Sequence, residues 1–432
     1  MGGGTNHWKG RISIFPRTAL ESLTSDGLRA WPIEWREIEM AYARVTENLK
    51  VTPVTERDLI RVKHVCEKCD SKFGFSLFQF IEPDSFVQLF KRIEEDENLT
   101  FRESTFCELI EQDELSSKLR LKCRKRRDGT EELTYEFIET DFVVVAGGCL
   151  QSTTLIYRSF PQETQSMPIG RYLQEHFDGY IGRLHLRRND YKCLKSLSLS
   201  ANRSFQEMNF GFGIRTGRHT KLHWHLEITP LARVYTFDPV SNRFNLGKKQ
   251  LKILFNLERI MTGPLFRAAR LLNKFLGRET YSLWLKGEEF GNRDSVVYAD
   301  KDEPTRVIYE HEVSRETRIE MKREVKVFDQ HLRKNRLGKI RFSPHVTMLR
   351  GVNTGANWHP LGSLRMHASE EKVVNEDATM IFDDRIMCVD SSVFATGAHH
   401  NPTAMAVTLA DIAVRKLISR IQAVQSYKNF KN

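Results

Sequence analysis

The C-terminal part of the chain contains a histidine, an aspartate and a helix start whose types and order could do chemistry. His359 could act as a general base, because imidazole titrates near neutral pH. Asp390 ends an apolar run, and ligands of open α/β sheets bind beyond the carboxyl ends of strands. Asn401–Thr403 predicts a helix N-terminus, whose N–H groups attract anions. A structural histidine, a turn aspartate and an ordinary capped helix are the plainer explanations, so the surrounding residues decide.

A metal site is the other chemistry that the sequence raises. Cys66 and Cys69 form a C-x-x-C pair with His64 nearby. A structural zinc site needs a second close pair of ligands, and Cys107 and Cys123 are too far apart in the sequence to supply it. We therefore expect no metal. The seven scattered cysteines argue against a disulfide framework and favour reduced thiols in the cytoplasm.

Composition bounds the class of protein. The chain has 432 residues, 40% of them hydrophobic and 28% charged, which is ordinary for a globular protein of two or three domains. The net charge is +10, but the basic residues are scattered, and the dense run at Lys122–Arg127 ends in Asp128–Gly129. We expect no nucleic-acid partner. No apolar run approaches the roughly 20 residues of a membrane span, and no signal peptide is visible.

The pattern of apolar residues predicts the elements that position these side chains. Val143–Val145 followed by Gly147 and a helix over 152–159 is typical of a doubly wound sheet. A second buried strand is expected over Arg385–Asp390. Alternating stretches at Leu119–Lys125 and Leu133–Ile138, with Asp-Gly between them, predict a hairpin. The helix that opens at Pro402 should reach about residue 421.

The middle of the chain has a different character. Alternation at Leu222–Ile228 and Val307–Val313 predicts antiparallel strands. Amphipathic helices are expected near 251–276 and 316–335. Glu288–Glu289 is interpreted as a solvated pair at the start of a new strand. This region should form a second domain, with one face of its sheet toward a core and the other toward a pocket or solvent.

Three C-terminal segments together resemble the signature of the glucose–methanol–choline (GMC) oxidoreductases. They are Asn357–Met366, Arg385–Phe394 and Asn401–Met405. The family pattern has His, two residues and Gly-Thr before Arg-Met, then a strand ending in Asp-Ala-Ser, then His or Asn before Pro. Here Gly362–Ser363 replaces Gly-Thr, and Ser391 replaces Ala.

Three further patches are similar to the family. Ile169–His176 looks like its Gly-Arg-x-Leu-x-x-His stretch, and Val143–Ser159 like its strand-and-helix segment. Gly2–Trp8 with Trp31–Ile33 resembles the flavin-side loop of sugar-acting (pyranose-oxidase-like) and choline-acting members.

The resemblance implies roles for the C-terminal residues. It places His359 as the base that takes a hydroxyl proton while a hydride passes to N5 of flavin adenine dinucleotide (FAD), and Asn401 as the residue that holds the substrate oxygen. Asp390 and Ser391 would lie against the ribityl and pyrophosphate portion. Backbone groups at Pro402 and Thr403 would face the flavin, and a helix N-terminus there suits its anionic reduced form. Asn401 cannot easily both cap this helix and bind substrate.

The same resemblance extends to the N-terminal residues and to Gly147. Gly3, Gly4 and Thr5 could form a backbone nest against the cofactor, although three glycines also suit a flexible terminus. His7 matches a position that carries a covalent flavin bond in some members and none in others. Gly147 closes the turn beyond the Val143–Val145 strand and is expected to bind the cofactor there.

The implied fold class is α/β (α+β overall), with two discontinuous domains. The FAD-binding domain would take residues 1–50, 100–179 and 346–432, and the substrate domain 51–99 and 180–345. No Gly-x-Gly-x-x-Gly unit occurs in the sequence, although the family carries one ahead of the Gly-Gly loop. We therefore expect the nucleotide-binding domain to be incomplete, which leaves three alternatives: a fragment of an active enzyme, one half of a split protein whose partner supplies this unit, or an inactive remnant.

Two hypotheses about function follow from this. The first is an FAD-dependent oxidoreductase that oxidises the CH–OH group of a sugar or another alcohol and passes electrons to an acceptor that the sequence does not identify. The second is a non-catalytic fragment, or a carbohydrate- or partner-binding module, that needs a separate N-terminal half to bind FAD.

Overall fold

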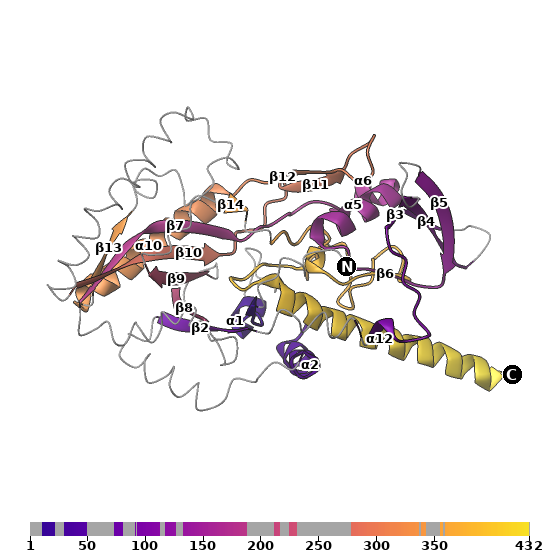
Figure 1. The fold of residues 1–432 in the computed structure, drawn as a ribbon, viewed down its shortest axis with the longest axis horizontal. Helices are drawn as coiled ribbons and strands as arrows, with labels where there is room; N and C mark the ends of the chain where they lie inside the picture. Colours follow the sequence, from indigo (N-terminus) through magenta and orange to yellow (C-terminus); the bar gives the residue numbers. More distant parts are fainter. Residues whose placement is uncertain are drawn as a thin grey trace.

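The protein has a mixed helix-and-sheet architecture, which a computed structural model describes for most of the chain (Figure 1). The described residues are 11–21, 30–49, 73–80, 91, 93–112, 117–126, 133–187, 211–216, 224–230, 278–336, 338–342, 355–356 and 359–431. Several predictions concern positions outside them, namely Gly3, Gly4, Thr5, His7, the Cys66–Cys69 pair and the helix near 251–276.

A large antiparallel sheet occupies one end of the molecule (Figure 1). Its strands follow the order β1 (Arg11–Ile12), β2 (Phe73–Phe80), β8 (Gly211–Thr216), β9 (Trp224–Pro230), β10 (Arg278–Gly287), β7 (Phe177–Arg187) and β13 (Gly338–Phe342), with β14 (Gly355–Ala356) also paired to β7. The alternating stretch near 222–228 is β9, which confirms the antiparallel strand predicted there. β1 lies at the edge of this sheet, although residues 1–50 were expected in the other domain.

Helix α10 (Arg315–Lys334) lies against this sheet and confirms the helix predicted over 316–335. Its N-terminus is capped by Ser314, whose side chain accepts a hydrogen bond from Thr317 N. Asp329 on the helix accepts a hydrogen bond of 2.6 Å from Ile340 N on β13, so a buried carboxylate joins the helix to the sheet.

The other half of the molecule contains a parallel strand pair. β6 (Val143–Val145) and β15 (Ile386–Cys388) pair in parallel, and α5 (Cys149–Ser159) follows β6 after the Gly147–Gly148 turn. This confirms the strand, turn and helix predicted from the Val-rich run. Within the described ranges the parallel sheet has only these two strands, so a larger doubly wound sheet stays a prediction.

Two smaller antiparallel units flank this pair. β3 (Thr105–Gln112), β4 (Leu119–Arg126) and β5 (Leu133–Thr140) form a meander, which confirms the predicted hairpin. β11 (Val296–Ala299) pairs with β12 (Val307–Glu310), where an antiparallel strand was also predicted. The short helices α1 (Arg17–Leu20) and α6 (Pro161–Ser166) and the turn of 3₁₀ helix η3 (Ser391–Val393) complete these regions.

The C-terminal helix α12 (Pro402–Lys431) extends about ten residues beyond the predicted end (Figure 1). It packs against α2 (Trp35–Asn48), and Met405, Leu409 and Ile412 share the main core with Ile38 of that helix. Arg44 of α2 also pairs with Asp411 of α12. The apolar stripe that Met405, Leu409 and Ile412 form on α12 therefore faces the core, which fixes the helix start beside the main-chain segment 394–401.

An aromatic cluster lies beneath that segment. The rings of Phe15, Trp31 and Phe394 are fully buried, with centroids 5.5 to 6.1 Å apart. Trp31 Nε1 donates a 2.9 Å hydrogen bond to Thr396 Oγ1. Buried aromatic side chains contribute large packing energies, so this cluster anchors the chain just before the helix that opens at Pro402.

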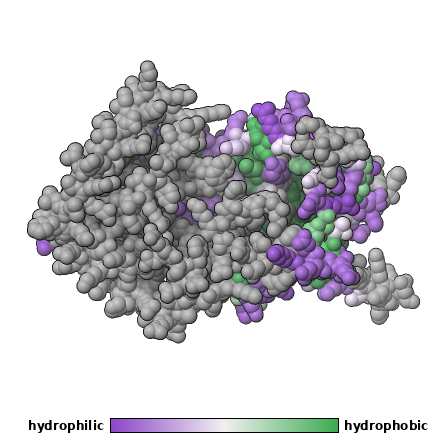
Figure 2. All heavy atoms as spheres, viewed as in Figure 1, coloured by the Kyte–Doolittle hydropathy of each residue, from purple (hydrophilic) through white to green (hydrophobic). Residues whose placement is uncertain are grey.

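The outer surface is mainly polar where its side chains are described. On the face drawn in Figure 2, hydrophilic side chains cover much of that surface and hydrophobic ones form smaller patches. Among the helices of the described ranges, none has the length and apolar character needed to cross a bilayer.

Candidate active site

The two motifs that carry histidines pair directly with each other. Gln174 and Leu361 form an antiparallel bridge through hydrogen bonds of 2.9 Å and 3.0 Å. One residue further along, Glu175 Oε1 accepts a hydrogen bond of 2.8 Å from His359 N. The Ile169–His176 segment therefore lies alongside the segment that begins at His359, although nearly two hundred residues separate them in the chain.

The residues that follow β15, Asp390–Ser392, form the third segment of this assembly. Gly362 N donates to Ser391 O at 3.0 Å, and Leu364 N donates to Ser392 O at 2.8 Å. The segment after His359 thus lies between the Ile169–His176 segment on one side and the residues after β15 on the other. The three separate sequence motifs are brought together by main-chain hydrogen bonds.

A glycine is required at the centre of this assembly. Gly362 has φ of 85°, and a Cβ built there would lie 3.1 Å from both Gln174 Nε2 and Tyr172 O. Left-handed backbone costs non-glycine residues of order 1 to 3 kcal/mol. The neighbouring Ser363 is fully buried, and its Oγ lies 2.6 Å from Thr153 Oγ1 on α5.

We expect Gly362→Ala to lower the free energy of unfolding by about 2 kcal/mol, because it combines this backbone strain with two tight contacts. Urea denaturation measures the change. Gly291→Ala is the matched control, since its Cβ would meet no atom closer than 3.5 Å and no left-handed backbone is recorded there. Equal stability of the two variants would contradict the tight packing at Gly362.

His359 contacts a second histidine. His176 Nδ1 lies 3.1 Å from His359 Nδ1, and the two rings meet edge to face with centroids 5.2 Å apart. His176 Nε2 lies 2.9 Å from Gly397 O. His176 is buried, and this burial lowers its pKa, partly offset by the Gly397 hydrogen bond. His359 is thereby linked, through His176, to the loop that leads to Asn401.

Glu175 supports both histidines through the main chain. Its Oε1 accepts hydrogen bonds from His359 N at 2.8 Å and from His176 N at 3.0 Å. Burial raises the pKa of the Glu175 carboxyl to about 7, although these two hydrogen bonds oppose the shift. This residue therefore holds the histidine backbones in place and titrates near neutral pH.

The interpretation of Glu288 and Glu289 as solvated residues is wrong. Both are 4% exposed and follow the end of β10 rather than start a strand. Glu288 Oε2 accepts a 2.7 Å hydrogen bond from Ala398 N, and Glu289 Oε1 accepts one of 2.8 Å from Glu175 N. Each carboxylate satisfies a backbone N–H that the folded loops would otherwise leave buried without an acceptor.

His311 joins the same buried acidic group. Its Nε2 lies 2.6 Å from Glu289 Oε1. Burial acts to lower the pKa of His311, but the hydrogen bond and the negative charges of Glu289 and Glu175 outweigh it, so this pKa is raised. A protonated His311 would compensate one of the buried carboxylates behind the two site histidines.

The predicted cofactor residues of the parallel strands meet at one edge. Gly147 follows β6 and Asp390 follows β15, and parallel strands place their carboxyl ends together. Asp390 Oδ2 accepts hydrogen bonds from Gly148 N and Ser152 Oγ, and Oδ1 accepts one from Ser392 N. Both carboxylate oxygens therefore already have donors within the chain.

The carboxyl edge nevertheless has room for a ligand. Gly148 has φ of 83°, and a Cβ built there would meet no described atom within 4 Å. Gly148 also precedes the first turn of α5, whose N-terminus favours anions. Open space, a glycine turn and a helix N-terminus fit the phosphate-bearing part of a dinucleotide through backbone groups rather than through the Asp390 carboxylate.

The remaining predicted residues lie at two places, the start of α12 and the carboxyl end of β15. Asn401, Pro402 and Thr403 are half-buried at the start of α12. Ser391, half-buried at the β15 edge, donates a 2.8 Å hydrogen bond to Pro360 O, beside His359. The choice between capping and substrate binding for Asn401 stays a prediction.

Four residues of this site, Glu175, His176, Glu288 and Glu289, were not predicted from the sequence. The Ile169–His176 motif resembles a stretch of the GMC family, but the resemblance gives no role to its last two residues. The adjacent acid and histidine at the end of this motif, Glu175 and His176, were the available signal that it contributes to the site.

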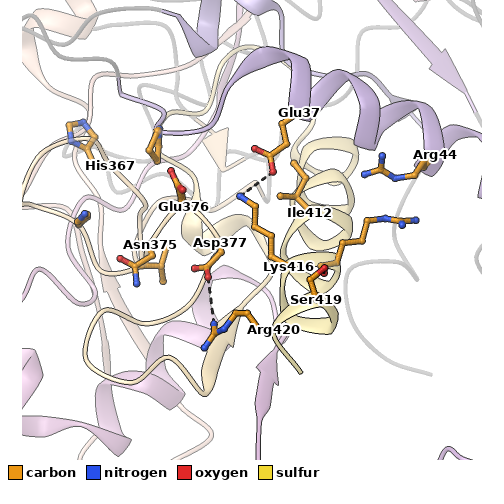
Figure 3. A pocket seen from close by; sticks show the side chains of 14 residues that line it. Glu37, Arg44, His367, Asn375, Glu376, Asp377, Ile412, Lys416, Ser419 and Arg420 are labelled. Atoms are coloured by element: carbon orange, nitrogen blue, oxygen red, sulfur yellow. Dashed lines mark hydrogen bonds and ion pairs between the residues drawn. The ribbon is translucent and has the colours of Figure 1, made fainter. Parts of the chain in front are cut away.

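A separate hollow of about 750 Å³ lies between α2, α12 and the segment 367–377 (Figure 3). Lys416 pairs with Glu37 at 3.0 Å, and Arg420 pairs with Asp377 at 3.6 Å, as the dashed lines in Figure 3 show. The wall residue Arg44 pairs with Asp411. Most basic side chains that line this hollow thus have acidic partners. None of the residues that line the hollow contacts His359 in the interactions described above.

Two general findings concern metals and thiols. Among the described residues, no group of three or more His, Cys, Asp or Glu side chains could hold a metal ion. The four cysteines within those ranges, Cys107, Cys123, Cys149 and Cys388, are free thiols.

Comparisons with known proteins identify the C-terminal part of the chain. Residues 294–410 match a family model described as GMC oxidoreductase. No curated protein sequence matches the chain. Among solved structures, a pyridoxine 4-oxidase from Mesorbium loti has 14% identity and a TM-score of 0.48, with 82% of this chain and 69% of that one covered. A fungal aryl-alcohol oxidase has 11% identity and a TM-score of 0.49, with coverages of 89% and 71%.

The family match spans His359, Asp390 and Asn401, which lie in the three C-terminal segments that carry the resemblance. At such low identities the solved structures add no further argument. Residues 294–410 of this chain therefore match the GMC oxidoreductase family, which confirms the resemblance that the C-terminal motifs predicted.

Proposed function

We propose that this protein acts in the oxidation of the CH–OH group of an alcohol or sugar, with FAD as its cofactor. The observation that carries the proposal is the junction of three motifs around His359, two of which lie in the segment that matches the GMC oxidoreductases. An oxidation of this kind removes a hydride from carbon and a proton from oxygen, so the site needs a base beside a hydride acceptor.

His359 is the proposed base. It is half-buried, which keeps it accessible to a substrate, and its backbone is held by the Glu175 carboxylate. The substrate hydroxyl would give its proton to the imidazole as the carbon loses its hydride, which leaves a carbonyl compound. Asn401 would donate a hydrogen bond to the same oxygen and hold it in place.

FAD, when bound, would supply the hydride acceptor. Backbone N–H groups in the first turn of α5, which follows the Gly147–Gly148 turn, would hold its phosphate-bearing part, since open space and a helix N-terminus are found there. Asp390 would act indirectly, because its carboxylate holds Gly148 N and Ser152 in place. The N-terminal residues of α12, Pro402 and Thr403, would stabilise negative charge near the flavin.

Reduction of an artificial electron-accepting dye tests this proposal. The purified chain, supplied with FAD, is assayed with separate panels of sugars, aryl alcohols and aliphatic alcohols. We expect dye reduction that requires both FAD and an alcohol, and the most active panel identifies the substrate class. Bound FAD that supports no dye reduction with any alcohol would contradict the proposed activity and favour the non-catalytic alternative.

A further inference from the structure

Three polar groups form a chain of contacts that ends at the proposed base. Gly397 O lies 2.9 Å from His176 Nε2, and His176 Nδ1 lies 3.1 Å from His359 Nδ1. All three groups belong to loops that converge only in the folded protein. Each distance is within hydrogen-bond range, so the chemistry of each atom decides which one carries the proton.

The carbonyl determines the first proton position. A carbonyl oxygen can only accept a hydrogen bond, so the proton of the first contact is on His176 Nε2. Burial lowers the pKa of His176 and therefore favours its neutral form. A neutral imidazole with its proton on Nε2 has a lone pair on Nδ1. His176 Nδ1 is then the acceptor of the second contact, and His359 Nδ1 must be the donor.

We infer that His176 is a positioning residue that holds His359 as the Nδ1–H tautomer, so that the lone pair of His359 Nε2 is the one that takes the substrate proton. This inference rests on the proposed function for the identity of the proton donor, but the tautomer itself is a property of the chain alone. The arrangement also suits both charge states of the base. When Nε2 gains the proton, Nδ1–H continues to donate to His176, and no ring rotation is needed.

The surroundings of His176 support this role. A Cβ built on Gly397 would lie 3.1 Å from His176 Nε2, so a side chain there would displace the ring from the carbonyl. The charged groups that act on His176 are Glu288, which raises its pKa, and Lys286, which lowers it. Glu175 holds its backbone N–H, and His359 faces its other ring nitrogen. The ring is therefore fixed from both ends.

The tautomers can be observed directly in the full chain without cofactor or substrate. Long-range proton–nitrogen NMR spectra of histidine-labelled protein distinguish Nδ1–H from Nε2–H imidazole, and the loss of a signal in His359→Gln and His176→Gln assigns each ring. We expect His359 in the Nδ1–H form, the less populated neutral form of free histidine, and His176 in the Nε2–H form. His359 in the Nε2–H form would overturn the inference.

Two substitutions at His176 separate positioning from simple packing. His176→Asn keeps a side-chain acceptor near the Nδ1 position, and His176→Leu removes it. We expect His359 to keep its Nδ1–H signal in the Asn variant and to lose that preference in the Leu variant. His176→Gln provides a polar replacement if the Leu variant does not fold. A His359 tautomer that is the same in every folded variant would overturn the role of His176.

Kinetics provide a second readout once a substrate is known. Loss of the acceptor should lower kcat about tenfold, the factor that one hydrogen bond contributes, with KM little changed. The Asn variant should recover most of this loss. His367→Gln is the control, because His367 is also a buried histidine but contacts Ser369 instead. A KM effect without a kcat effect would contradict the positioning role, whereas an inactive wild type with the expected tautomers would count only against the proposed function.

Discussion

His359→Gln should slow the oxidation of the alcohol by about 100- to 10,000-fold, the range that a positioned general base contributes. The glutamine side chain has nearly the same length and can form hydrogen bonds, but it cannot accept and carry a proton at neutral pH. FAD affinity should be unchanged, because the proposed FAD contacts are made by backbone groups in the first turn of α5 and at the start of α12. Anaerobic mixing of FAD-loaded protein with substrate measures the rate directly.

The matched control for this variant is His367→Gln. His367 is buried, and its Nδ1 lies 2.7 Å from Ser369 Oγ, outside the contacts of His359. We expect this control to react at the wild-type rate, so that general effects of replacing a buried histidine are accounted for. A His359→Gln variant that also reacts at the wild-type rate would exclude His359 as the base.

Glu175→Gln should raise the free energy of unfolding by about 3 kcal/mol near pH 8 and by less than about 1 kcal/mol near pH 5. In the folded protein the pKa of Glu175 is raised from 4.5 to about 7 by burial. The folded state therefore binds the proton more tightly than the unfolded state does. The protonated Glu175 carboxyl makes its full contribution to the free energy of unfolding below pH 4.5. This contribution falls as the pH rises toward 7 and is absent well above 7.

Urea denaturation across this pH range measures the effect. Glutamine keeps an oxygen that can accept from His359 N and His176 N, so it removes the cost of a buried charge without removing the acceptor. Glu376→Gln is the control, since Glu376 is exposed and should show no such pH-dependent difference. Parallel pH profiles for wild type and Glu175→Gln would show that Glu175 is not a buried titrating group.

The parts of the fold that could be predicted from sequence depend on local signals. The β4–β5 hairpin follows from two alternating stretches around Asp128–Gly129, and the β6–α5 unit from a Val-rich run that ends in glycines. The start of α12 follows from Asn401-Pro402. In each case neighbouring residues determine the conformation, so no knowledge of distant contacts is needed.

The details of the site depend on distant contacts and could not be predicted in this way. His176 and His359 are 183 residues apart, and they are brought together by the bridge between Gln174 and Leu361 and by the Glu175 carboxylate. The Glu288–Glu289 pair has the composition of a solvated turn, yet both side chains accept from backbone N–H groups of other loops. The extension of α12 beyond residue 421 was also missed, because its apolar stripe weakens where the helix leaves the core.

The absorbance spectrum of the purified chain after incubation with FAD and gel filtration tests the central claim most directly. The proposal predicts flavin absorbance that elutes with the protein and is bleached when an alcohol substrate is added without oxygen. Colour that remains with the acid-precipitated protein would show that the flavin is covalently attached, and His7 is the residue predicted to carry that bond. A colourless protein at every FAD concentration would contradict flavin binding by this chain and would favour a module that requires a separate N-terminal half.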